Sequence, residues 1–214
     1  MNRKHFLFAL TATITIQAAC DRGDDAGPRT GEFAAEPEAK AAPLAGAAKV
    51  ERGRYLVNAG ACNDCHTPWK VGPNGPEPDM SRQLSGHPAA FEMPPPPAAS
   101  GPWIGAIGAT NTAWAGPWGV SFTANLTPDP TTGIGTWTEQ NFIDTIRNAR
   151  HMGAGRPLLP PMPAPMYAQL TDEDLGSIFA YLRTIPAIDN KVPAPRPPVT
   201  AALAPATTSI ATRN

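Results

Sequence analysis

Cysteine is scarce in this chain of 214 residues, which contains only three. A structural zinc site needs four Cys or His ligands, usually supplied as two closely spaced pairs. Cys62 and Cys65 form one such pair, but the third cysteine, Cys20, lies far from them near the N-terminus. Because no second pair stands at ligand spacing, the cysteine pattern disfavours a zinc site.

An excess of charge of either sign is also lacking. Lys and Arg total 17 and Asp and Glu total 18, so the formal net charge is −1. Nucleic-acid binders are usually strongly basic, and acidic tail proteins carry the opposite bias. We therefore expect no nucleic-acid partner.

No apolar run is long enough to span a bilayer, which takes about 20 residues. The run from Phe6 to Ala19 has 14 residues and follows the basic residues Arg3 and Lys4. This arrangement is typical of an export signal. We predict that residues 1–20 are a signal peptide and that the protein is periplasmic.

Cys20 ends this segment after Gln17-Ala18-Ala19. The pattern resembles a bacterial lipobox, in which small residues precede a cysteine that becomes diacylated, although Gln17 stands where that pattern usually has Leu. The resemblance implies lipidation of Cys20 and a membrane anchor. The alternative is an ordinary signal cleaved nearby, which leaves Cys20 in the signal or as a terminal thiol.

Large apolar side chains are few on both sides of the central region. Residues 21–48 are mostly Ala, Gly and Pro with scattered charges, and residues 188–214 are rich in Pro, Ala and Thr. Such segments cannot offset the entropy cost of ordering. We expect a flexible linker at 21–48, one domain at 49–187 and a disordered tail at 188–214.

Sustained alternation of apolar and polar β-forming residues is absent from the domain, so we predict an all-α fold. Three helices are expected: from about Lys49 to Asn58, from near Thr138, and from Thr171 to a stop at Pro186. The threonines can cap the second and third helices. Between the first and second helices, prolines crowd residues 71–119, which we interpret as a long Pro/Gly-rich loop insertion packed over one edge of the functional site. A disordered insertion is the alternative.

The pentapeptide Cys62-Asn63-Asp64-Cys65-His66 has the spacing of c-type haem attachment. The two sulfurs form thioethers with the porphyrin vinyl groups, and the histidine binds the iron. A thioredoxin-like redox pair would belong to a βαβ pattern, which does not surround this stretch. Because the motif occurs once, we predict one covalent haem c held by Cys62, Cys65 and His66.

The second axial ligand must come from another part of the chain. Met162 lies in Pro160-Pro161-Met162-Pro163, where flanking prolines favour a stiff, extended loop over a helix. Such a loop suits the presentation of one thioether, so we predict Met162 as the ligand. Met166 and a bis-histidine site with His151 are the main alternatives. The other candidates are Met80, Met93, Met152 and His87.

Four stretches in this order make the domain resemble the class I cytochromes c. They are Gly53-Arg54-Tyr55-Leu56, the haem motif, the loop around Met162, and Phe179-Ala180-Tyr181-Leu182. The resemblance implies that Gly53 packs against Tyr181 or Phe179. Met162 follows His66 by 96 positions, a longer spacing than in compact members of the family.

Three further stretches are similar to periplasmic cytochromes that serve dehydrogenases: Asn125-Leu126-Thr127-Pro128-Asp129, Gly133-Ile134-Gly135-Thr136-Trp137 and Thr171-Asp172-Glu173-Asp174. This likeness implies a one-electron carrier, not an enzyme, that takes electrons from a dehydrogenase and passes them to a respiratory chain. A peroxidase-like haem enzyme and a gas-binding haem sensor are the alternatives, and both need an open sixth position on the iron.

Overall fold

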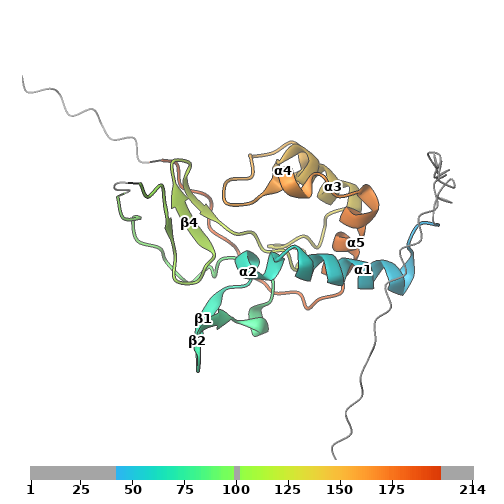
Figure 1. The fold of residues 1–214 in the computed structure, drawn as a ribbon, viewed down its shortest axis with the longest axis horizontal. Coiled ribbons are helices and arrows are strands. Elements are labelled where there is room, and N and C mark those ends of the chain that lie inside the picture. Colours follow the sequence, from blue (N-terminus) through green and yellow to red (C-terminus); the bar gives the residue numbers. More distant parts are fainter. Residues whose placement is uncertain (1–41, 99–101, 199–214) are drawn as a thin grey trace, which may run out of the picture. The chain divides into compact units, whose positions relative to one another are not determined.

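The fold is described from a computed structural model, which places residues 42–98 and 102–198. The predicted signal peptide, Cys20 and most of the predicted linker lie outside these ranges. The helices are α1 (Gly46–Ala59), α2 (Cys62–His66), α3 (Glu139–Asn148), α4 (Ala164–Tyr167) and α5 (Asp172–Leu182), with short 3-10 turns η1 (Met80–Arg82) and η2 (His151–Gly153) (Figure 1). None of the helices in the described ranges is long and apolar enough to cross a membrane.

Local capping explains where two of the three predicted helices begin. The Thr138 side chain accepts a hydrogen bond from the Asn141 N–H, and the Asn141 side chain accepts one from the Thr138 N–H, which forms a capping box at α3. At α5 the Thr171 side chain accepts from the Asp174 N–H. These starts and the predicted helix at α1 are confirmed.

Helix α1 crosses α5 at Gly53, and the two helices approach too closely for a side chain there. A Cβ atom at Gly53 would lie 1.8 Å from the Ser177 carbonyl oxygen and 2.8 Å from the Tyr181 Cβ. The pairing of Gly53 with Tyr181 that the class I resemblance implied is thereby confirmed. This contact packs α1 against α5 and thereby positions the Cys62–His66 motif that follows α1.

Replacing Gly53 by alanine should lower the free energy of unfolding by about 1–3 kcal/mol, because the methyl group overpacks the crossing. Helix propensity alone would raise the free energy of unfolding by about 1 kcal/mol, because alanine favours a helix more than glycine does. A decrease in the free energy of unfolding therefore indicates overpacking of the helix crossing. Denaturant unfolding followed by circular dichroism measures it. Asn58→Ala, at an exposed site on the same helix, is the control and should change the value by less than about 0.5 kcal/mol.

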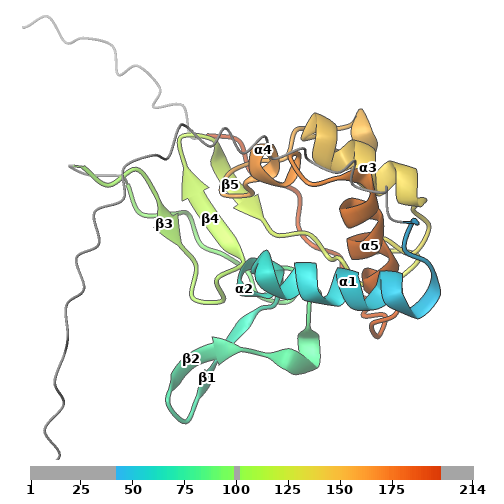
Figure 2. The same cartoon turned by 45° about the vertical axis from the view of Figure 1, so that its right-hand side comes forward.

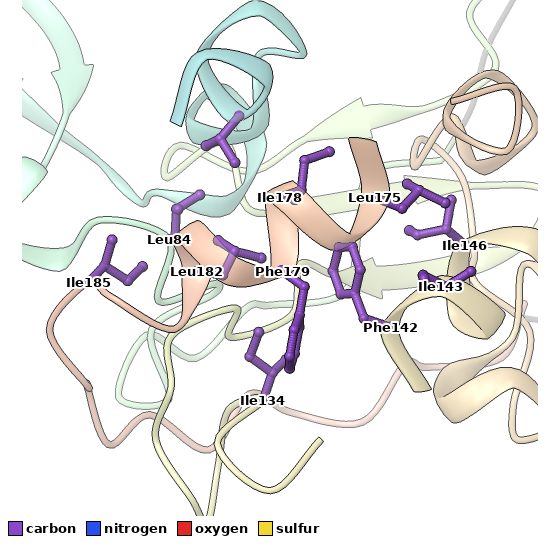
Figure 3. Close-up of a cluster of buried hydrophobic side chains, with 11 residues drawn as sticks. Leu84, Ile134, Phe142, Ile143, Ile146, Leu175, Ile178, Phe179, Leu182 and Ile185 are labelled. Carbon is purple, nitrogen blue, oxygen red and sulfur yellow. The ribbon is translucent and has the colours of Figure 1, made fainter. Parts of the chain in front are cut away.

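The main core lies where α1, α3 and α5 meet. Phe142 and Phe179 are in tilted contact, with ring centroids 5.7 Å apart, and the other side chains surround them (Figure 3). Leu175, Ile178, Phe179 and Leu182 follow one another at helical spacing and form an apolar stripe on α5, which is buried in this cluster. The buried members of the cluster are Val57, Leu84, Ile134, Phe142, Ile143, Ile146, Leu175, Ile178, Phe179, Leu182 and Ile185.

The prediction of an all-α fold is wrong, because the segment predicted as a long loop contains two antiparallel sheets. The first is the hairpin of β1 (Trp69–Gly72) and β2 (Gly75–Pro78). The second has the strand order β3 (Ala106–Ile107), β4 (Ala113–Gly116) and β5 (Gly119–Phe122) (Figure 2). The domain therefore mixes helices with short strands.

These strands escaped detection for physical reasons. They are two to four residues long, too short for a period of two to stand out. Both hairpins contain proline, which usually argues against a strand. Pro76 and Pro78 lie in a sheet of only two strands, where each strand is an edge and a missing N–H is tolerated. The turn of each hairpin ends at a glycine with positive φ, which is +116° at Gly75 and +93° at Gly119. These glycines were the sequence feature that could have indicated the hairpin turns.

Residues 188–198 pack along the second sheet and the chain that leads into it. Arg196 pairs with Val120 of β5 through two backbone hydrogen bonds of 2.9 Å. The buried Asn190 side chain donates to the carbonyl oxygens of Ser85 and His87 at 2.7 and 2.9 Å and accepts from the Ala89 N–H at 2.9 Å. This part of the segment assigned to the tail is thus bound to residues that lie 76 to 105 positions earlier in the chain.

Candidate functional site

The Cys62–His66 pentapeptide forms helix α2 directly after α1. Ala61 between the two helices adopts a left-handed conformation with φ of 54°, which turns the chain sharply at the motif. Positions three and four apart in a helix share a face, so Cys62, Cys65 and His66 are presented together. Both thiols are free and partly exposed. The structure thus brings the three predicted motif residues to one place.

His66 is held in one orientation. The residue is 9% exposed, and its Nδ1–H donates to the Ala124 carbonyl oxygen at 2.8 Å. This bond assigns the proton to Nδ1 and leaves the Nε2 lone pair available, which is the usual arrangement for a metal-binding histidine. Burial lowers the pKa of His66, so the ring is neutral at pH 7 and suited to bind iron.

The thiols are in their neutral form. Burial raises the pKa of Cys62 to about 11 and also raises the pKa of Cys65. A reactive cysteine needs a lowered pKa, because the thiolate is the nucleophile. The raised pKa values therefore disfavour the thiol-redox alternative. In the described ranges, no cluster of three or more Cys, His, Asp or Glu side chains could hold a metal ion.

Met162 is partly buried against the main core, which Cys62 also contacts from α2. The loop that carries it precedes α4, whose first turn is Ala164–Tyr167. Met162 and the Cys62–His66 motif therefore border the same hydrophobic cluster. This placement agrees with a ligand role, which remains a prediction.

The other candidates for the second ligand are less well placed. Met166 is 72% exposed, and His151 is also exposed, with its ring edge-on to Trp137 at 5.2 Å. His87 is fully buried, and its two ring nitrogens are engaged by the Thr112 hydroxyl and the Phe91 carbonyl oxygen. Met80 and Met152 are exposed, and Met93 packs in the second, smaller cluster.

Two side chains that were not predicted to have a role, Tyr167 and Arg147, fix α4 and the chain that follows it, next to the loop of Met162. The Tyr167 hydroxyl donates to the Gly60 carbonyl oxygen, just before Cys62. The Arg147 guanidinium, from α3, donates to the carbonyl oxygen of Ala168, to that of Leu170 at 2.7 Å, and to the Asp172 carboxylate. No local pattern could reveal these contacts, because they join residues from 21 to 107 positions apart.

The residues at the site fit a haem c group. Two thiols and an oriented, neutral imidazole lie on one helix, as covalent attachment and axial ligation require. Two polar atoms on the neighbouring sheet segment, Trp114 Nε1 and Thr123 Oγ1, are buried without a hydrogen-bond partner among the described residues. Such atoms are rare in native proteins, where a water molecule, an ion or a ligand usually provides the missing partner.

Comparison with curated proteins finds relatives that are cytochrome subunits of dehydrogenases. The gluconate 2-dehydrogenase cytochrome c subunit of Pantoea cypripedii is 32% identical over 134 residues, which are 63% of this chain and 22% of the relative. The fructose dehydrogenase cytochrome subunit of Gluconobacter japonicus is 30% identical over 135 residues, 63% of this chain and 21% of the relative. The cytochrome c subunit of the quinone-type alcohol dehydrogenase of Gluconacetobacter polyoxogenes is 29% identical over 139 residues, which are 65% of this chain and 22% of the relative.

The chain spans about a fifth of the length of these relatives. No protein-family model matches it. The likenesses confirm the predicted resemblance to cytochromes c that serve dehydrogenases. They also support the predicted class, an electron-transfer protein with haem c rather than an enzyme.

Proposed function

We propose that this protein is a mono-haem c-type cytochrome that carries single electrons in the periplasm, from a dehydrogenase to a respiratory chain. The observation that carries the proposal is the geometry of the motif. Cys62 and Cys65 share a helix with His66, whose Nδ1–H is fixed by the Ala124 carbonyl oxygen. The partner class is supported by the relatives, which are cytochrome subunits of dehydrogenases.

In this proposal Cys62 and Cys65 hold the haem covalently, and His66 and Met162 are its axial ligands. When bound, haem c supplies a one-electron Fe(II)/Fe(III) couple, whose potential is raised by Met/His ligation. The chain's own residues supply orientation and environment. Ala124 keeps His66 in its binding tautomer, and the buried core beside Met162 excludes water from the site.

The occupancy of the sixth position separates a carrier from the haem enzyme and the gas sensor. The purified protein should show one covalent haem per chain and a reversible one-electron redox titration. Its reduced form should not bind carbon monoxide rapidly, because Met162 fills the position. Rapid binding by the wild-type protein would favour an enzyme or a sensor, and reduction by a dehydrogenase fraction with its substrate would support the proposed donor.

We also propose a membrane anchor through lipidation of Cys20, which lies outside the described residues. Replacing Cys20 by alanine should move the protein from the membrane fraction to the soluble periplasmic fraction. Each buried CH₂ of an acyl chain contributes about 0.8 kcal/mol, and stable anchoring needs more than one chain. Fractionation followed by haem staining measures the shift. A wild-type protein found only in the soluble fraction would indicate an ordinary cleaved signal.

A further inference from the structure

The loop that carries Met162 has few backbone donors of its own. Five of the nine residues at positions 157–165 are proline, which has no N–H group. The Leu158 N–H binds the Ala149 carbonyl oxygen at 2.8 Å, and the Met162 N–H donates within the loop, to Leu159 at 3.3 Å. The prolines make the loop stiff, but they cannot bind it to the rest of the domain. Its position near Met162 therefore depends on donors from other elements.

The first such donor lies on the inserted sheet. Ser121 of β5 is 8% exposed, and its hydroxyl donates to the Pro160 carbonyl oxygen at 2.6 Å, two residues before Met162. The Trp114 carbonyl oxygen is farther from the same hydroxyl, at 3.3 Å, so the single proton serves Pro160. Strand β5 lies beside the chain that leads into α4 (Figure 2). The inserted sheet thus holds the loop on the N-terminal side of Met162.

The second donor acts on the other side of Met162. Tyr167 is the last residue of α4, five positions after Met162, and its hydroxyl donates to the Gly60 carbonyl oxygen. A Cβ atom at Gly60 would lie 3.4 Å from the Tyr167 ring and 3.8 Å from the Cys62 sulfur, so the ring packs beside the start of the motif. The loop is thereby bound to the turn that leads into α2.

The two hydroxyls bind the loop to the same elements that hold the rest of the site. Three residues after Ser121, the Ala124 carbonyl oxygen orients His66, and two residues after Gly60 comes Cys62. A movement of the loop away from the motif breaks both hydroxyl bonds. Each bond therefore adds to the free energy that opening of the loop requires.

We propose that Ser121 and Tyr167 are positioning residues that hold the Met162 loop from its two ends and thereby govern how readily the thioether leaves the iron. The inference rests on the proposed function, in which Met162 is the sixth ligand. It gives the inserted sheet a task, because Ser121 belongs to a segment first expected to be a loop. A sixth position that rarely opens is what separates a carrier from a gas-binding protein.

The test measures the rate at which imidazole binds to the oxidised holoprotein, followed by loss of the weak near-infrared sulfur-to-iron band. Imidazole enters after Met162 leaves, so the rate reports how often the loop opens. Ser121→Ala and Tyr167→Phe each remove one oxygen atom and keep the shape of the side chain. Each variant should bind imidazole about fivefold faster than the wild type, because a neutral hydrogen bond typically changes an equilibrium by about that factor. The double variant should be faster than either.

Two controls separate loop opening from a general loss of stability. Gly53→Ala lowers the free energy of unfolding at the crossing of α1 and α5 without a contact to the loop, so it should keep the wild-type rate. Tyr55→Phe removes a hydroxyl from a tyrosine that is 60% exposed on α1 and should also leave the rate unchanged.

An unchanged rate in either Ser121→Ala or Tyr167→Phe would overturn the inference. An equal acceleration in Gly53→Ala would overturn it as well, because the effect would then follow stability and not the loop. Both results leave the proposed function standing. A wild-type protein that lacks the sulfur-to-iron band and binds imidazole without delay would instead overturn the ligand role of Met162 in the proposed function.

Discussion

Haem should become fully extractable from the polypeptide by acid acetone when Cys62 and Cys65 are both replaced by alanine. The two thioethers are the only covalent links that the motif offers, and His66 alone binds the iron reversibly. Cys62 and Cys65 are the two cysteines of the described residues, so no other thiol in that part of the chain can replace them. Haem staining after denaturing electrophoresis measures the loss, which should be complete.

Cys20→Ala is the matched control for the double substitution. It removes a thiol outside the motif and should leave the haem attached to the polypeptide. Single substitutions at Cys62 or Cys65 should retain part of the covalent haem, because one thioether remains. Extraction of haem from the wild-type protein under the same conditions would rule out c-type attachment.

Met162→Ala should abolish the weak near-infrared sulfur-to-iron absorption of the oxidised protein. It should also lower the midpoint potential and allow the reduced protein to bind carbon monoxide. A thioether binds ferrous iron better than ferric iron, so its loss removes stabilisation of the reduced state. Met162→His should restore a six-coordinate, low-spin iron at a potential below that of the wild type.

Met166→Ala is the control, because Met166 is 72% exposed in the next helix and its loss should leave the sulfur-to-iron band in place. The opposite pattern, with the band lost only in Met166→Ala, would move the ligand to Met166. If His151→Ala alone changed the spectrum, the site would be bis-histidine and the high-potential carrier would be excluded.

Features written in short stretches of sequence could be predicted. The caps at Thr138 and Thr171 act over three residues, and the α5 stripe repeats with the helical period, so both could be located from the sequence. The Cys62–His66 motif is equally local. Gly53 marked the helix crossing because a glycine inside a helix needs a packing reason.

Features that depend on distant partners could not be predicted in this way. The strands of the inserted segment are too short to show their period, and the prolines within them suggested irregular backbone. The hydrogen bond of Tyr167 to Gly60 and the bond of His66 to Ala124 join residues 107 and 58 positions apart. Only the folded chain shows which carbonyl oxygen orients the histidine.

Asn190 has a consequence for how the molecule unfolds and how it can be divided. Its side chain joins the segment around Ser85 to the chain after α5, while the Ile188 carbonyl oxygen accepts a hydrogen bond from Asn125 at 2.8 Å. These hydrogen bonds tie residues 188–198 to the segment around Ser85 and to Asn125. A gene product shortened after residue 187 would keep every helix of the described residues and still lose these bonds, so a domain for expression should include residues 188–198.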